Sequence, residues 1–156
     1  MSLEFKRLHP HFFAAASPIA LRAVHDPETL AAIRAAMDEH AVIVFHDQAF
    51  SDAEQLDFAR RLDGVLHAKT GARAIGKNRL GDEEALTDIS NVGDDGALLA
   101  AQDRRRLYRL GNRLWHTDAS FEDPAGRYSM LHARVVPPAT AGADTARDVH
   151  ELHRDN

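Results

Sequence analysis

A helical pattern that leads directly into a strand pattern is the feature of this 156-residue sequence that most constrains its fold. Apolar side chains recur at the spacing of one helix face at Leu30, Ile33 and Met37. Asp26 can cap this helix and Pro27 suits its first position, so we expect a helix from about Pro27 to Glu39. The following run Ala41–Phe45 is apolar, β-branched and too short for a helix, which favours a buried strand. The two patterns together predict a fold of mixed helices and strands.

A second helix is expected a few residues after this strand. Ser51 and Glu54 have the spacing of a capping box, in which each side chain accepts a hydrogen bond from the other residue's backbone N–H. The helix should end near Gly64, and its apolar face consists of Leu56, Ala59, Leu62 and Leu66. A stretch rich in glycine and charge follows to about residue 85, and loops of such length often carry function.

Two further strands are predicted in the second half of the chain. The first is Leu86–Val92, followed by a glycine-rich turn at residues 93–96. The second is Arg127–Pro137, which has β-branched and aromatic content with a broken alternation. There is no internal repeat and no linker, so we expect one domain. A chain of this length can bury about two-thirds of its unfolded surface and thus form a real core.

The composition excludes several classes of protein and of site. The chain has no cysteine, so disulfides and thiolate metal sites are excluded, and His, Asp and Glu remain as strong ligands. A net charge of −5 argues against general nucleic-acid binding, and we interpret the arginine-rich run Asp103–Arg113 as a solvated face or loop. No apolar run approaches the roughly 18 residues of a spanning helix, and the N-terminus lacks a signal-peptide core. We therefore expect a cytoplasmic protein without a membrane or nucleic-acid partner.

The pair His116 and Asp118 has the spacing of two ligands of one metal ion. Ten histidines and 24 acidic residues give about 1.5 His-x-Asp/Glu matches by chance, and the chain has two, the second at His153 and Asp155. On an extended segment both side chains would share one face, as two-thirds of a two-His-one-carboxylate facial triad. The alternative is a half-buried histidine that is hydrogen-bonded to a nearby aspartate. Spacing alone does not decide between these two interpretations.

The residues around this pair resemble one enzyme family in several blocks that agree in order and distance. The blocks are Trp115–Phe121 (WHTDASF), the run RYSMLHARVVPP from Arg127, and Gly142–Thr145 (GADT). They are similar to the iron and α-ketoglutarate dependent dioxygenases of the taurine dioxygenase and 2,4-dichlorophenoxyacetate dioxygenase group, with the phenoxyacetate branch the closer one. Upstream segments match as well, so the resemblance covers about Leu8 to Thr145.

The resemblance implies roles for individual residues. His116 and Asp118 would be the first two Fe(II) ligands, and the Thr145 hydroxyl would hydrogen-bond a carboxylate of the α-ketoglutarate co-substrate. The implied activity uses molecular oxygen and couples oxidative decarboxylation of α-ketoglutarate to hydroxylation of a small organic acid, of aryloxyalkanoate or sulfonate type. No catalytic residue beyond the metal ligands is implied.

Weaker candidates lie on the substrate side of the implied site. Asn112 stands four residues before His116, and His67 and Lys69 lie in the glycine-rich stretch where similar proteins place substrate contacts. Lys69 could meet a substrate carboxylate as a point charge. The alternative for these residues is an exposed loop position. Trp115 and Phe121 are expected in the core or in the wall of the site.

The implied fold is α+β, a partial double-stranded β-helix (jelly roll) with N-terminal helices packed on a mostly antiparallel sheet. Residues 1–145 would be the N-terminal part of this domain, and 146–156 a divergent polar tail. Ala143 replaces the second glycine of the family's block. After Thr145 the pattern stops, where similar proteins continue with strands that carry a distal histidine and an arginine for α-ketoglutarate. His150 and His153 are the only later histidines, on a tail without the support that a metal site needs.

Two functional hypotheses therefore stay open. The chain is an oxygenase by lineage, shortened or one half of an assembly, or it is a non-catalytic remnant with at most weak metal binding. A small binding module that uses the arginine run is a third, with less support from the net acidity. An incomplete sheet would leave strand edges uncovered, so a homo-oligomer is possible. We expect negligible α-ketoglutarate turnover by this chain alone, because two ligands and no distal arginine would hold iron and keto acid weakly.

Overall fold

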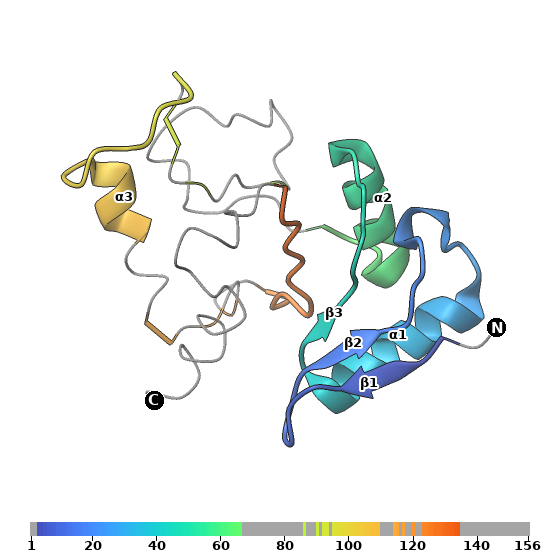
Figure 1. The fold of residues 1–156 in the computed structure, drawn as a ribbon. Helices are drawn as coiled ribbons and strands as arrows, with labels where there is room; N and C mark the ends of the chain where they lie inside the picture. The colour runs from blue at the N-terminus through green and yellow to red at the C-terminus, as the bar shows by residue number, and fades with distance from the viewer. Residues whose placement is uncertain are drawn as a thin grey trace.

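The computed structural model describes residues 3–66, 86, 90, 92–93, 95–109, 114–115, 117, 120 and 123–134. In chain order its elements are β1 (Phe5–Arg7), β2 (Ala14–Ala16), the 3-10 helix η1 (Leu21–Ala23), α1 (Pro27–His40), β3 (Ile43–Val44), α2 (Asp52–Asp63) and α3 (Arg104–Arg109). All of these except α3 belong to residues 3–66, the N-terminal unit, in which α1 lies across the sheet and α2 stands beside it (Figure 1).

The three strands form one mixed sheet in the order β1-β2-β3. β1 and β2 are the antiparallel arms of a hairpin, with Lys6 opposite Ala15. β2 and β3 are parallel, with Ala14 opposite Ile43. Parallel neighbours need a long crossover, and η1 and α1 form it here. A mostly antiparallel jelly-roll sheet was expected. The described residues contain a three-stranded mixed sheet with helices, which is not a complete jelly roll.

α1 begins as its sequence predicts. The Asp26 carboxylate accepts a hydrogen bond from the backbone N–H of Thr29 at 2.7 Å, and Pro27 occupies the first turn. That backbone bond, assisted by the Thr29 side chain, holds the pKa of Asp26 below its usual value. The helix ends at His40, one residue later than expected, and Ala41 follows in the left-handed region with φ of 61°.

α2 confirms the predicted capping box. The Ser51 hydroxyl accepts from the Glu54 backbone N–H at 3.3 Å, and the Glu54 carboxylate accepts from the Ser51 backbone N–H at 2.8 Å. The backbone bond to Ser51 contributes most to holding the pKa of Glu54 below its usual value. The helix ends at Asp63, and Gly64 follows with φ of 84°, a conformation that favours glycine. Leu66, which was predicted on the apolar helix face, lies beyond this end.

The core of the N-terminal unit is formed by η1, α1, α2 and the residues that connect them. Ile33 of α1 and Phe58 of α2 are its best-covered large side chains, with 1% and 2% of their surface exposed. The buried cluster consists of Leu21, Val24, Leu30, Ile33, Phe58 and Leu62. The helical periodicity in the sequence thus identified Leu30, Ile33, Leu56 and Leu62 as buried, whereas it missed Phe58. Met37 and Ala59, which were predicted on the same faces, are half-buried.

β3 is shorter and less covered than predicted. The apolar run Ala41–Phe45 was expected to be a buried strand, but the strand contains only Ile43 and Val44, and both are half-buried. Val42 is 44% exposed. Two features explain the difference. The left-handed Ala41 turns the backbone just before the strand, and β3 pairs only with β2 among the described residues.

The predicted strand Leu86–Val92 lies mostly outside the described residues. Val92 forms an isolated antiparallel bridge with Leu98. The backbone N–H of Gly93 donates to the Ala97 carbonyl at 2.7 Å, so the glycine-rich segment reverses the chain as expected.

The arginine-rich run contains the short helix α3. The Asp103 carboxylate pairs with the Arg105 guanidinium at 3.0 Å and accepts from the Arg105 backbone N–H at 2.8 Å. The bond to the Arg105 guanidinium contributes most to holding the pKa of Asp103 below its usual value, and the bond to the Arg105 backbone contributes next. Arg104 and Arg106 are exposed, as expected for a solvated face. No helix in the described part of the chain is long and apolar enough to span a membrane.

Residues 126–134, hereafter segment 126–134, return to the N-terminal unit and lie beside β3 and the chain that leads to α2 (orange to red in Figure 1). A strand with broken alternation was predicted at Arg127–Pro137. No strand is assigned within 127–134, and residues 135–137 lie outside the described part. Burial nevertheless alternates regularly, with half-buried residues at Gly126, Tyr128, Met130 and His132. The apolar pattern of the sequence is broken there although burial alternates, because the inward row includes Tyr128 and His132, which an apolar pattern does not count.

Candidate functional site

The residues predicted to form the site lie outside the described part of the chain. This applies to the two metal ligands, the α-ketoglutarate contact and the three substrate-side candidates: His116, Asp118, Thr145, Asn112, His67 and Lys69. It also applies to His150 and His153. Their roles therefore stay predictions, and the described geometry concerns their neighbours in the chain.

The structure describes Trp115, Thr117 and Ser120 of the Trp115–Phe121 block and Leu114 just before it. The Thr117 hydroxyl donates to the Ser120 hydroxyl oxygen at 2.7 Å. Trp115 is 62% exposed and Leu114 is 72% exposed. Trp115 is therefore not part of the buried core, and its expected place in the wall of the site stays a prediction.

No group of three or more His, Asp or Glu side chains within the described residues could hold a metal ion. Two histidines approach each other at the β1–β2 hairpin, where the His9 and His11 rings are 5.8 Å apart between centroids. His9 Nδ1 accepts from the His11 backbone N–H at 3.3 Å, which occupies one of its two nitrogens. The described structure therefore offers no competing metal centre.

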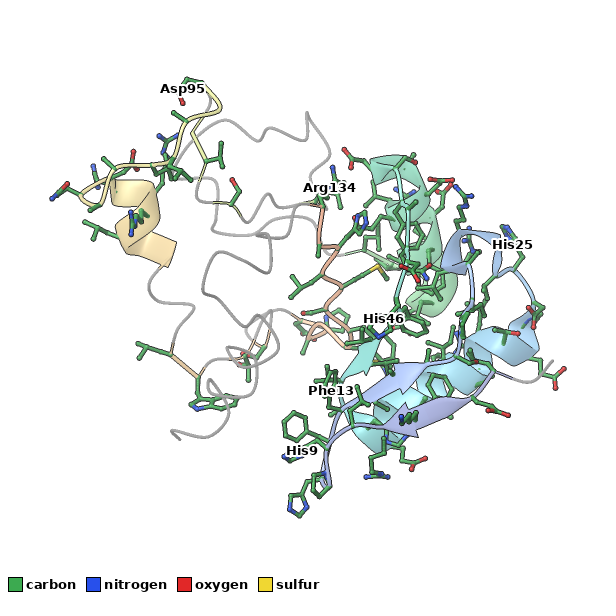
Figure 2. All side chains as sticks on the ribbon, viewed as in Figure 1. His9, Phe13, His25, His46, Asp95 and Arg134 are labelled. Atoms are coloured by element: carbon green, nitrogen blue, oxygen red, sulfur yellow. The ribbon has the colours of Figure 1, made fainter. Side chains whose placement is uncertain are left out.

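Segment 126–134 leads from the predicted ligand block toward Thr145, and ion pairs hold it at both ends. Near its start, the Arg127 guanidinium lies 3.8 Å from the Asp38 carboxylate of α1 and 4.0 Å from the Asp63 carboxylate of α2. At its end, Arg134, which is labelled in Figure 2, pairs with Asp52, the first residue of α2. The segment therefore runs antiparallel to α2 along its whole length.

The inward row of the segment packs on the core between these ion pairs. Tyr128 and Met130 contact the buried cluster of the N-terminal unit. The His132 ring meets the Phe50 ring edge-on, with centroids 5.7 Å apart. Leu131, between these inward residues, is 83% exposed. The segment thus has one buried face and one exposed face.

The Gln48 side chain connects three parts of the N-terminal unit. Its carboxamide nitrogen donates to the carbonyls of Ile19 at 2.7 Å and His46 at 2.6 Å. Its carboxamide oxygen accepts from the Leu21 backbone N–H at 3.0 Å. The preceding residue, Asp47, has φ of 56° and turns the backbone there. The backbone at Gln48 is therefore held in a defined place.

His132 of segment 126–134 contacts the backbone of Gln48. Its Nε2 lies 3.0 Å from the Gln48 carbonyl oxygen, so Nε2 carries the proton and donates, since a carbonyl only accepts. Nδ1 is buried and has no hydrogen-bond partner among the described residues. Sequence reasoning missed both residues. The one signal that could have indicated His132 is its spacing of two and four residues from Met130 and Tyr128, which places all three side chains on the same face of an extended segment.

A groove of about 490 Å³ lies between β1 and α1. Its lining consists of Phe5, Arg7, Ala32, Ala35, Ala36, Glu39 and His40. Arg7 pairs with Glu39 at 2.9 Å, and the buried His40 has an Nδ1 without a partner. Because its charged groups pair with each other and its floor is alanine, we do not assign this groove to the candidate site.

The sequence matches the family model described as taurine catabolism dioxygenase TauD, TfdA family, over residues 4–155. It is 38% identical over 148 residues to the alpha-ketoglutarate-dependent 2,4-dichlorophenoxyacetate dioxygenase of Burkholderia sp. strain RASC. It is 40% identical over 148 residues to the protein of the same name from Cupriavidus pinatubonensis. Each alignment covers 93% of this chain.

A solved structure is similar to the fold as well. The crystal structure of AAD-2 in complex with Mn(II) and N-oxalylglycine superposes with a TM-score of 0.60 and 36% sequence identity, over 78% of this chain and 38% of that one. The alignments to the two 2,4-dichlorophenoxyacetate dioxygenases cover 48% and 49% of those proteins. The chain thus spans about half the length of the curated relatives that it matches.

Proposed function

Because the chain belongs to the TauD, TfdA family of dioxygenases, we propose that it provides the first two metal ligands, His116 and Asp118, of a non-haem iron oxygenase. The match to the family model over residues 4–155, which includes this pair, is the observation that carries the proposal. The proposed reaction couples oxidative decarboxylation of α-ketoglutarate to hydroxylation of a small organic acid. The names of the similar proteins favour an aryloxyalkanoate as that acid, although a sulfonate is a second candidate.

The donor set fits ferrous iron in its chemistry. One imidazole and one carboxylate are two members of a facial triad, and the absence of cysteine leaves oxygen and nitrogen donors only. Iron bound there with α-ketoglutarate would supply the oxidising chemistry of the reaction. His116 would contribute a neutral nitrogen lone pair, and the Asp118 carboxylate would offset part of the metal charge.

Four further residues of this proposal would contact the co-substrate or the substrate. The Thr145 hydroxyl would donate a hydrogen bond to a carboxylate of α-ketoglutarate. Lys69 would attract the substrate carboxylate as a point charge, and His67 and Asn112 would contact the substrate with neutral polar groups. A cytoplasmic location is part of the same proposal, since each proposed substrate is a small soluble acid.

The alternative function is a non-catalytic remnant of the same fold. A facial triad needs a third ligand besides His116 and Asp118. No set of three ligands exists within the described residues. The two functions share every residue of this chain, so a binding measurement must separate them.

An anaerobic titration of the 156-residue chain with Fe(II), with and without α-ketoglutarate, tests the proposal. Chelation of the keto acid to bound iron gives a weak visible charge-transfer band, and that band should disappear in His116→Ala and Asp118→Ala. The matched control is His153→Ala, because His153 and Asp155 have the same spacing outside the family block. No band at any iron concentration would establish the remnant instead. A band lost equally in His153→Ala would contradict the assignment of His116 and Asp118 as the sole pair of ligands from this chain.

A further inference from the structure

Segment 126–134 must be held in one register for the proposed site to have a fixed geometry. His132 lies 14 residues after Asp118 and 13 residues before Thr145, so it is close to the middle of the chain between the two proposed cofactor contacts. A slip of one residue along an extended segment moves it about 3.3 Å and turns the inward row outward. Metal–ligand distances tolerate only about 0.2 Å. A device that fixes this register would therefore control the proposed site.

The apolar part of the inward row cannot select the register by itself. Met130 is unbranched and adapts to irregular spaces, so it fits several positions on the core. The ion pairs of Arg127 and Arg134 involve long side chains that are about half exposed, with side-chain exposures of 55% and 40%. Such exposed pairs contribute little to a unique geometry. A short hydrogen-bonded contact at a half-buried position is the more selective element.

We propose that His132 and Gln48 form a positioning pair that sets the register of segment 126–134. The Gln48 carboxamide is bonded on three sides, to Ile19, His46 and Leu21, which leaves its backbone carbonyl in one place. His132 Nε2 donates to that carbonyl at 3.0 Å, while Phe50 limits the rotation of the imidazole from the side. Neither residue contacts substrate or metal in this assignment; both act through the segment that connects the cofactor contacts.

This inference rests on the proposed function for its consequence in metal binding, but its structural part can be measured without metal. Trp115 is the single tryptophan of the chain and directly precedes His116, so its fluorescence reports on the ligand block. If segment 126–134 loses its register, the block is tethered less firmly and the fluorescence anisotropy of Trp115 falls. Metal binding is measured separately, as free Mn(II) by electron paramagnetic resonance in the presence of α-ketoglutarate.

His132→Phe is the decisive variant, because it keeps an aromatic ring against Phe50 and removes only the donor. We expect lower Trp115 anisotropy and about fivefold weaker Mn(II) binding, the factor that corresponds to a typical hydrogen bond of about 1 kcal/mol. His132→Gln places an amide N–H near the position of Nε2 and should restore both to within about twofold. Leu131→Ala is the matched control, since it truncates the neighbouring side chain on the exposed face.

Each outcome decides the proposal. Unchanged anisotropy and affinity in His132→Phe, or an equal change in Leu131→Ala, would overturn it. If His132→Phe does not fold, Gln48→Met decides instead, because it leaves His132 intact and removes the bonds that hold the acceptor. If the unsubstituted chain binds no Mn(II) through His116, the proposed function fails, and the anisotropy of the metal-free variants still decides whether the pair sets the register.

Discussion

Ile33 is the best-covered side chain of α1, with 1% of its surface exposed, and its truncation should remove much of the stability of the N-terminal unit. Ile33→Ala deletes the equivalent of three methylene groups, which at about 0.8 kcal/mol each amounts to about 2.4 kcal/mol. The cavity left in the core adds to this, and such substitutions cost about 2–5 kcal/mol. A unit of this length has a free energy of unfolding of only about 3–10 kcal/mol.

Urea unfolding followed by far-ultraviolet circular dichroism measures this loss, because α1 and α2 are the main helices of the described chain. Ile33→Val deletes a single methylene group and should cost about 0.5–1.5 kcal/mol. Val65→Ala is the matched control, an aliphatic truncation at a position that is 89% exposed, and should change stability by less than about 0.5 kcal/mol. A lower midpoint at an unchanged slope identifies lost stability.

The order of the three variants is the critical result. Ile33→Ala should lie well below Ile33→Val, and Val65→Ala should match the unsubstituted chain. If Ile33→Ala and Val65→Ala had the same midpoint, the packing of α1 against α2 described above would be refuted.

Three other perturbations of the N-terminal unit have defined outcomes. Ser51→Ala removes the hydroxyl that caps α2 and should lower its stability by about 1 kcal/mol, seen in the urea midpoint; no change would argue against the capping box. Asp26 and Glu54 have folded-state pKa values below their usual 3.8 and 4.5. Their carboxylates therefore stabilise the folded state above those usual values, and this stabilisation is lost as the pH falls through the lowered pKa. The melting temperature should therefore fall between about pH 5 and pH 3, and Asp26→Asn, which still caps, should reduce this slope. Gly64→Ala meets no atom within 4 Å but must adopt φ of 84°, and should cost about 1 kcal/mol in the same urea assay, whereas a stabilising effect would contradict the described turn.

The helices were predictable because their signals are local. Asp26 and Pro27, or Ser51 and Glu54, lie within three residues of each other, and the structure confirms both helix starts. β1 and β2 were not predicted, since strands of three residues such as Ala14–Ala16 have neither β-branched side chains nor a measurable period. Their pairing depends on partners elsewhere in the sequence, which no local pattern encodes.

The candidate site was predictable only as a resemblance between motifs. Spacing alone left His116 and Asp118 at the level expected by chance, and the family match supports them without describing their geometry. The Gln48–His132 contact joins residues 84 positions apart, so nothing in the sequence near either residue indicates it. Buried polar side chains of this kind are invisible to a search for apolar periodicity.

The free edge of the sheet has a consequence for how further strands or other copies can join it. Among the described residues β1 pairs only with β2, and two of its three residues are the exposed cations Lys6 and Arg7. A strand that approached this edge would have to desolvate both charges, which is how many natural sheets prevent unwanted pairing. The opposite edge, at β3, has apolar residues and lies beside segment 126–134. Further strands are therefore expected to pair at the β3 edge and not at the β1 edge. The same holds for a second copy of the chain that associates through a strand edge.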